Sequence, residues 1–247
     1  MAGLIDVLFG LAARLAGART EKIVAALVAK RAAQVAPAEA LRLLLRLDNT
    51  LYALTGRYAV AYGGGDHTKH RHTRYFDFFV ERCRTGEQVA DIGCGGGALA
   101  QALAAKGCRV QAVDLSAANI AAARARHDHP GVTWRVGDAT TAGTVEPCEV
   151  VILSNVLEHI AGRPDFLRRT VAATGAKRLL IRVPLFERDW RVPLKRELGV
   201  EHRLDPTHET EYTLAEFEAE MAEADVAIVA AEVHWGEIWA ECRPKAP

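Results

Sequence analysis

The 247-residue chain has no net charge, only nine prolines, only five cysteines and no long apolar run. The balance of 31 basic and 31 acidic side chains excludes a strongly basic nucleic-acid binder, so we expect no nucleic-acid partner. The scarcity of proline excludes a collagenous or low-complexity chain. The cysteines are odd in number and form no C-x-x-C pair, so they fit neither a disulfide framework nor a zinc knuckle, and they favour a reducing environment.

Signals for membrane insertion or export are also weak. No segment approaches the roughly 18 uninterrupted apolar residues that a spanning helix needs. The N-terminal segment has no cationic start and carries Asp6 within its apolar run, so it is a poor secretory signal, and we expect a cytoplasmic protein. Leucines at helical spacing in residues 1–17 predict an amphipathic helix. This helix packs on the rest of the protein or, alternatively, makes a weak contact with a membrane surface.

The chain instead contains two successive patterns of secondary structure. Residues 1–69 are rich in Ala, Leu and Arg and predict a helical extension, with Pro37 between two helices and three glycines at 63–65 ending the pattern. Residues 70–247 alternate β-branched runs with Ala-rich amphipathic segments, which predicts an α/β fold with a Rossmann-like, doubly wound parallel sheet. In such sheets ligands bind at the carboxyl ends of the strands. The expected strands include residues 88–92, 109–114, 132–136, 149–155 and 178–184.

A glycine-rich loop follows the first expected strand. It reads DIGCGGG over residues 91–97 and leads directly into a helix, whose free N–H groups and partial positive charge favour a ligand. The same glycines match a dinucleotide site, and a tight turn without a ligand is the simplest alternative. Asp91 favours a ligand that carries an ammonium group, because a carboxylate would oppose a pyrophosphate.

Acidic residues also end the second and third expected strands. Asp114 lies at the tip of the second strand, where a carboxylate can accept both hydrogen bonds of a ribose diol. Its alternative role, capping the next helix, is already filled by Ser116. Asp138 and Ala139 follow the third strand and could bind the amine and ring edge of an adenine, although a plain turn also explains this sequence.

Together the segments VADIGCGGGALAQAL, VQAVDLS, VGDAT and VVILSNVLEHI resemble the class I S-adenosylmethionine-dependent methyltransferases. The resemblance covers about residues 75–183, with a weaker match over 211–229. It implies S-adenosyl-L-methionine as the cofactor and a seven-stranded sheet whose last strand is antiparallel. The implied cofactor contacts are Asp91, Gly93, Cys94, Gly95, Asp114, Leu115, Asp138, Ala139 and Asn155.

Two departures from the sequence patterns of related enzymes restrict the type of methyl transfer that we expect. The fourth strand ends in SNVL, residues 154–157, and not in the [DN]-P-P-Y of enzymes that methylate exocyclic base nitrogens. Some relatives carry E-x-x-E-H at this point and bind a divalent metal with it. This chain has Asn155 in place of the first carboxylate, and we therefore expect no metal.

His159 and Glu158 are the predicted catalytic residues. His159 follows the fourth strand, and a neutral imidazole, whose ordinary pKa is ~6.5, accepts a hydroxyl proton at neutral pH. The alternative is a histidine that only orients its loop together with Glu158.

A long segment, residues 184–212, follows the fifth strand where a short link would suffice, and such loops are typical of lids and binding elements. We interpret it as a substrate cap inserted in a methyltransferase domain over 70–247. The expected substrate contacts are Trp190, His202, His208 and Tyr212. The Thr213-x-x-Glu216 pattern after it is a capping box that starts a helix.

Three histidines precede the first strand, namely His67, His70 and His72. Their spacing does not place all three on one helical face, so we expect a polar flap over the cofactor or an anion-binding edge and not a metal site.

These features predict an S-adenosylmethionine-dependent methyltransferase that acts on a small-molecule or glycan-like acceptor, most simply at oxygen. The N-terminal helices and the cap would form its lid. The choice of oxygen depends on the available histidine base and the missing [DN]-P-P-Y. The alternatives are an NAD(P)-dependent Rossmann oxidoreductase that uses the same glycines, and a non-catalytic or membrane-peripheral binding module.

Overall fold

The computed structural model describes residues 19–245, which form two compact units. The first contains residues 19–58 together with Leu194–His202, and the second contains Ala59–Pro193 together with residues 203–245. This division differs from the predicted boundary after residue 69, and it assigns part of the predicted cap to the helical unit. The predicted helix over residues 1–17, with its membrane contact, lies outside the described residues.

The first unit contains helix α2 (Thr20–Ala32) and most of helix α3 (Pro37–Tyr62). The last residues of α3, from Ala59 on, belong to the second unit. Pro37 is the first residue of α3, a position that its fixed φ and missing N–H favour. The predicted break between two helices is therefore confirmed. The segment Leu194–His202 is held on α3 by polar contacts. Lys195 Nζ lies 2.7 Å from the Asp48 carboxylate, and Arg42 Nε donates to the Leu198 carbonyl at 3.0 Å. Among the described helices, none is long and apolar enough to cross a bilayer.

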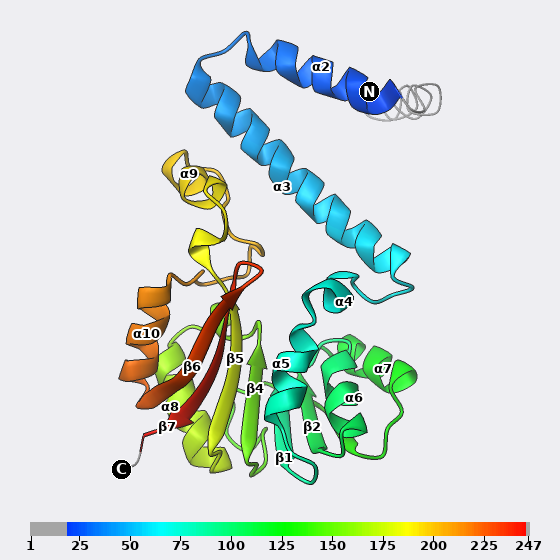
Figure 1. The fold of residues 1–247 in the computed structure, drawn as a ribbon, viewed down its shortest axis with the longest axis vertical. Helices are drawn as coiled ribbons and strands as arrows, with labels where there is room; N and C mark the ends of the chain where they lie inside the picture. The colour runs from blue at the N-terminus through cyan, green and yellow to red at the C-terminus, as the bar shows by residue number, and fades with distance from the viewer. Residues whose placement is uncertain (1–18, 246–247) are drawn as a thin grey trace. The chain divides into compact units, whose positions relative to one another are not determined.

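The second unit is built on a seven-stranded sheet of strand order β3-β2-β1-β4-β5-β7-β6 (Figure 1). Its strands are β1 (Gln88–Ile92), β2 (Arg109–Asp114), β3 (Val132–Val136), β4 (Val150–Ser154), β5 (Arg178–Pro184), β6 (Val226–His234) and β7 (Glu237–Pro244). The pairs among β1 to β5 are parallel, whereas β7 pairs antiparallel with both β5 and β6. The predicted doubly wound sheet with an antiparallel last strand is therefore confirmed.

Helices cover both faces of this sheet because residues along each strand alternate between two apolar clusters. In β4, Val150 and Ile152 belong to one cluster, and Val151 and Leu153 belong to the other. The first cluster also contains side chains of α5 (Tyr75–Arg82) and α6 (Ala98–Ala105). The second contains those of α8 (Arg163–Thr174) and α10 (Leu214–Glu223). The remaining helices are α4 (Lys69–Thr73), α7 (Ala117–Arg126) and α9 (Arg191–Glu197).

The predicted start of α10 is confirmed. The Thr213 side chain accepts a hydrogen bond from the backbone of Glu216, and the Glu216 carboxylate accepts one from the backbone of Thr213. This reciprocal pair satisfies two N–H groups that no helical carbonyl can reach. The box therefore fixes the residue at which α10 begins.

Candidate active site

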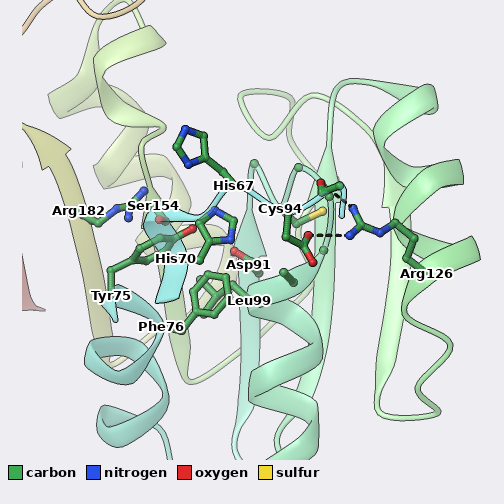
Figure 2. A pocket seen from close by; sticks show the side chains of 17 residues that line it. His67, His70, Tyr75, Phe76, Asp91, Cys94, Leu99, Arg126, Ser154 and Arg182 are labelled. Atoms are coloured by element: carbon green, nitrogen blue, oxygen red, sulfur yellow. Dashed lines mark hydrogen bonds and ion pairs between the residues drawn. The ribbon is translucent and has the colours of Figure 1, made fainter. Parts of the chain in front are cut away.

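A cavity of about 290 Å³ lies beyond the carboxyl ends of β1 and β4, within the second unit (Figure 2). The chain leaves β1 toward β2 on one side and enters β4 on the other, so this is the point where the strand order reverses, the usual ligand site of such a sheet. Four of the predicted cofactor residues line the cavity, namely Asp91, Gly93, Cys94 and Gly95. The glycine loop picked out in the sequence therefore borders a cavity.

The glycine loop is shaped by backbone conformations that side chains would oppose. Gly97 has φ +79°, and a Cβ built on it would lie 2.4 Å from the Trp134 ring and 2.9 Å from the Ala123 Cβ. A larger residue would push the loop away from α7 and β3. With glycine here, α6 begins directly behind the loop, and its first N–H groups face the cavity end of the sheet.

Asp91 is the charged group at the base of this cavity. Its side chain is 2% exposed, and Oδ2 has no hydrogen-bond partner among the described residues. Burial, with a further contribution from Asp114, raises the pKa of Asp91 to about 7. A buried carboxylate oxygen without a partner is costly to keep, because it has lost water without gaining a donor. The group is thus suited to a cationic partner that enters the cavity.

Asp114, at the end of β2, connects two loops. Its Oδ2 accepts a hydrogen bond from the Gly95 N–H at 2.8 Å, and its Oδ1 accepts one from the Ser116 N–H at 2.8 Å. Ser116 caps α7 as predicted, because its Oγ accepts the Asn119 N–H at 3.2 Å. The Asn119 side chain also donates to Asp114, so this carboxylate helps to hold the start of α7 as well as the glycine loop.

The other predicted cofactor residues are more dispersed. Asp138 is exposed, and its Oδ1 accepts hydrogen bonds from the backbone and hydroxyl of Thr140, which lower its pKa. Ala139 lines a separate, mostly apolar cavity of about 380 Å³ beside α8. Leu115 is 73% exposed. Asn155 follows β4 with φ +56°, and its Oδ1 accepts a hydrogen bond from Arg182 Nε at 3.2 Å.

Arg182 is a cavity residue that the sequence analysis missed. It lies on β5, is nearly fully buried, and its guanidinium carbon lies 3.5 Å from the centroid of the Tyr75 ring. Glu237 balances part of its charge at 3.6 Å. Burial raises the pKa of Tyr75 to about 12. An arginine within the apolar run RLLIRVP was the available signal, since a central strand rarely buries a charge without a partner.

The histidines before the first strand also reach the cavity. His67 and His70 line it together with Asp66, which forms an ion pair with Arg126 at 2.7 Å (Figure 2). Burial, followed by the charge of Lys69, lowers the pKa of His70 to about 4, so this ring is neutral at physiological pH. The chain turns sharply at Arg74, which has φ +53° and separates α4 from α5.

A second group of polar side chains gathers after β4. Glu158 and His159 lie on the 3₁₀ helix η2 (Leu157–His159), and His208 comes from the segment before α10. One ligand atom of each residue lies within 4.8 Å of those of the other two. The His159 and His208 rings are edge to face, with centroids 4.6 Å apart. Of the predicted substrate contacts, only His208 meets the predicted catalytic pair in this way.

The electrostatics of this group favour neutral imidazole at His159. Burial is the main cause of a lowered pKa at His159, and nearby His208 adds to it. Glu158 is completely buried, and both of its carboxylate oxygens are without a hydrogen-bond partner in the described part of the chain. Burial raises the pKa of Glu158 to about 7. The three groups could therefore accept a proton or bind a cation.

The structure places the remaining predicted substrate contacts elsewhere. Tyr212 is completely buried in the core, and its hydroxyl donates to Glu220 at 2.8 Å. Its ring packs edge to face on Phe217 within the core, so no part of the side chain is open to a substrate. Trp190 is 72% exposed. His202 belongs to the first unit, beside α3 residues.

Comparisons with known proteins point to methyltransferases. A family model described as "Methyltransferase domain" matches residues 89–175. A ubiquinone biosynthesis O-methyltransferase from Bradyrhizobium diazoefficiens is 34% identical over 127 residues, 49% of each chain. The chain thus spans about half the length of the curated relatives it matches.

Two solved structures share the fold at low sequence identity. Magnesium protoporphyrin IX methyltransferase from Synechocystis, solved with bound SAH, is 18% identical with a TM-score of 0.57, over 71% of this chain and 84% of the other. A TehB-like SAM-dependent methyltransferase from Corynebacterium glutamicum is also 18% identical, with a TM-score of 0.55 over 81% of this chain and 100% of the other.

The strand order, the glycine loop and the cavity at the reversal point define a Rossmann-like methyltransferase fold. The family model described as "Methyltransferase domain" matches the part of the chain that holds the glycine loop and strands β1 to β4. The resemblance recognised in the sequence is confirmed.

Proposed function

We propose that this protein transfers a methyl group from S-adenosylmethionine to an oxygen atom of a small-molecule acceptor. The observation that carries the proposal is Asp91, a buried carboxylate with an oxygen that has no partner in the described chain, at the base of the cavity beside the glycine loop. A cofactor that carries an ammonium group would supply the missing donor. A dinucleotide pyrophosphate would instead be repelled by this charge.

Residues that line the cavity, together with acids at the ends of the neighbouring strands, would hold this cofactor. Asp91 would hold the amine, and the backbone of Gly93 and Gly95 would allow close approach of the chain. Asp114 would accept the ribose hydroxyls while it keeps the Gly95 N–H at 2.8 Å, and Asp138 with Ala139 would bind the adenine edge. S-adenosylmethionine supplies a methyl group on a cationic sulfur, so the protein needs to align the acceptor and remove its proton.

In this proposal His159 accepts the proton of the acceptor's hydroxyl group. His159 is exposed and follows β4, with Glu158 beside it. Partial desolvation of the ring lowers the pKa of His159, which favours a neutral imidazole that can accept a proton. The curated relatives are named as O-methyltransferases, which supports oxygen as the acceptor atom. A glycan-like acceptor and a substrate cap over residues 184–212 stay predictions, as does the absence of a nucleic-acid partner.

The cofactor is tested by thermal melting of the purified protein with S-adenosylhomocysteine or NADH. S-adenosylhomocysteine should raise the melting temperature in proportion to its saturation of the folded state, whereas NADH should leave it unchanged. A shift with NADH alone would support the oxidoreductase alternative. No shift with either would support a non-catalytic module.

The role of His159 is tested separately from cofactor binding. His159→Ala should retain the thermal shift with S-adenosylhomocysteine and slow methyl transfer to an acceptor found by screening with labelled cofactor, by roughly 10²- to 10⁴-fold. His234→Ala, on the edge strand β6, is the matched control and should leave turnover unchanged. Equal turnover in the two variants would remove His159 from the reaction.

A further inference from the structure

We propose that Arg182 binds a carboxylate group of the methyl acceptor, so that the acceptor is a small hydroxy acid. The inference rests on the proposed function, since it specifies which acceptors the same site takes. Arg182 lines the cavity and would hold the carboxylate, while the hydroxyl group of the acceptor lies at His159. The ammonium group of the cofactor would lie at Asp91, on the other side of the cavity.

The first argument is the position of Arg182 where the core ends and the cavity begins. One apolar cluster, which also contains side chains of α5 and α6, receives one residue each from β1, β4 and β5, namely Val89, Ile152 and Leu180. Two positions further along each strand, and therefore on the same face of the sheet, the chain carries a polar side chain, namely Asp91, Ser154 and Arg182. All three line the cavity, and Arg182 is the cation among them.

The second argument is the distance between Arg182 and the expected site of the cofactor's amino-acid group. Asp91 is in register with Ile152, and Ile152 is in register with Leu180. Arg182 therefore lies two strands from Asp91, about 10 Å across the sheet, and two residues further along. In Figure 2, Arg182 lies on one side of the cavity and Cys94 of the glycine loop on the other. The carboxylate of S-adenosylmethionine shares a carbon with its ammonium group, so an ammonium group at Asp91 keeps both near the glycine loop.

The third argument is that the guanidinium group is held in place while much of its charge stays uncompensated. Its Nε donates to Asn155 Oδ1 at 3.2 Å, and its carbon lies 3.5 Å from the centroid of the Tyr75 ring. Within residues 19–245 its one ion pair is with Glu237 at 3.6 Å, which is longer than a hydrogen bond. A guanidinium group offers five N–H donors in a planar fork that matches a carboxylate. The terminal nitrogens are therefore suited to an anion that enters the cavity.

A second cation adds to the positive potential beside Arg182. Lys69 is the first residue of α4, and its neighbouring histidines line the cavity. In the part of the chain that the structure describes, the Lys69 ammonium group has no ion pair. Burial, followed by the positive charge of Arg182, lowers the pKa of Lys69, whereas the acids Glu237 and Glu158 raise it. The two cations therefore lie close together and attract an anion jointly.

The charge balance favours a carboxylate over a phosphate. Two acids act on this pair of cations, and burial raises the pKa of one of them, Glu158, to about 7, so that it is partly protonated at neutral pH. The net positive charge is therefore small. A carboxylate carries one negative charge, whereas a phosphate monoester carries about −1.5 to −2 at pH 7. The additional charge of a phosphate would be repelled by Glu237 and Glu158.

The test compares hydroxy acids with their amides as acceptors. The panel contains hydroxybenzoic, hydroxycinnamic and aliphatic hydroxy acids, each beside the matching carboxamide, with labelled S-adenosylmethionine. The parent protein should methylate acids with a kcat/KM roughly 10- to 100-fold higher than that of the amides, because a hydrogen bond between charged groups is lost in the amide. Arg182→Gln should abolish this preference by raising the KM of the acids, and Arg182→Lys, which keeps the charge, should retain part of it.

Two further variants complete the comparison. Lys69→Gln, at an exposed position, should lower the preference for acids roughly two- to fivefold. Arg109→Gln is the matched control, because Arg109 is an exposed arginine at the start of β2, and this variant should show the preference of the parent. If Arg182→Gln does not fold, the preference of the parent and the effect of Lys69→Gln decide the inference.

Binding of S-adenosylhomocysteine separates the two proposals. Every folded variant should bind S-adenosylhomocysteine by calorimetry as tightly as the parent does. A loss of that affinity in both Arg182 variants, with the preference for acids unchanged, would assign Arg182 to the carboxylate of the cofactor and overturn the inference. A parent protein that methylates amides as fast as acids, or none of the acids, would overturn it too. The proposed function stands in these cases if the parent binds S-adenosylhomocysteine, and it falls if the parent does not.

Discussion

Replacing Asp91 with asparagine should stabilise the protein at high pH and weaken its response to the cofactor. The carboxyl group is buried, and its pKa is raised to about 7, mainly by burial. In an unfolded chain the pKa of an aspartate is ~3.9, so the folded state carries an unfavourable charge above pH 7. At about 1.4 kcal/mol per pH unit, this charge costs at most roughly 4 kcal/mol. Asparagine still buries a polar amide, and we expect a gain of about 2 kcal/mol, or roughly 4–8 °C in Tm.

The stability difference between the parent and Asp91→Asn should grow with pH. Below pH ~4 the carboxyl group is protonated in both folded and unfolded states, so the parent and Asp91→Asn should be equally stable. As the pH rises toward 7, the unfolded chain releases the proton more readily than the folded one, and the parent loses stability relative to the variant. The difference should be constant above pH 7.

Saturating ligand should remove most of the variant's stability advantage, because a 10- to 100-fold loss of affinity corresponds to about 1.4–2.7 kcal/mol. Bound S-adenosylhomocysteine places an ammonium group beside Asp91 in our proposal, and a hydrogen bond to a charged group contributes about 1.5–3 kcal/mol. Asp91→Asn should therefore bind S-adenosylhomocysteine roughly 10- to 100-fold more weakly by calorimetry at pH 8. Thermal melts at pH 5 and pH 8 measure the stability difference.

The exposed Asp128 provides the control, since Asp128→Asn should change neither quantity. The reasoning is refuted if Asp91→Asn binds S-adenosylhomocysteine as tightly as the parent. A stability difference that is the same at pH 5 and pH 8 would contradict the buried-charge argument alone.

Two further predictions concern the loops around the cavity. Asp114→Ala should weaken S-adenosylhomocysteine binding at least tenfold by calorimetry, because a charged acceptor of the ribose is lost; unchanged affinity would contradict the ribose role. Gly97→Ala should lower stability by about 3 kcal/mol in denaturant melts, since its Cβ would lie 2.4 Å from the Trp134 ring at a left-handed φ. A Cβ on Gly96 would meet no described atom within 4 Å, so Gly96→Ala should melt like the parent, and equal melting of the two variants would refute the steric argument.

Much of the sheet could be predicted because its signals are local. The strands β1, β2, β3 and β5 fall on the residues expected from short β-branched runs between Ala-rich segments. The glycine loop and its acid are local too, because a strand, a turn and a helix N-terminus follow one another within ten residues of Asp91. The capping box at Thr213 is read from four consecutive positions.

Contacts between distant segments could not be predicted in this way. Arg182 reaches the Tyr75 ring only because α5 packs against β5 in the folded protein, and the apolar run around Arg182 hides this role. Tyr212 has the composition of a binding residue, yet the return of the chain toward α10 places its ring in the core. A residue's type sets what it can bind, whereas packing decides what it meets.

The sequence alone determined the class of fold and the position of the glycine loop, because strand and helix periodicity and glycine spacing act over a few residues. The meeting of His208 with Glu158 and His159 was decided by tertiary structure. It depends on backbone hydrogen bonds that attach the segment before α10 to the turn after β4. Such an attachment has no periodicity in the sequence, since it follows from how two irregular segments pack at one end of the sheet.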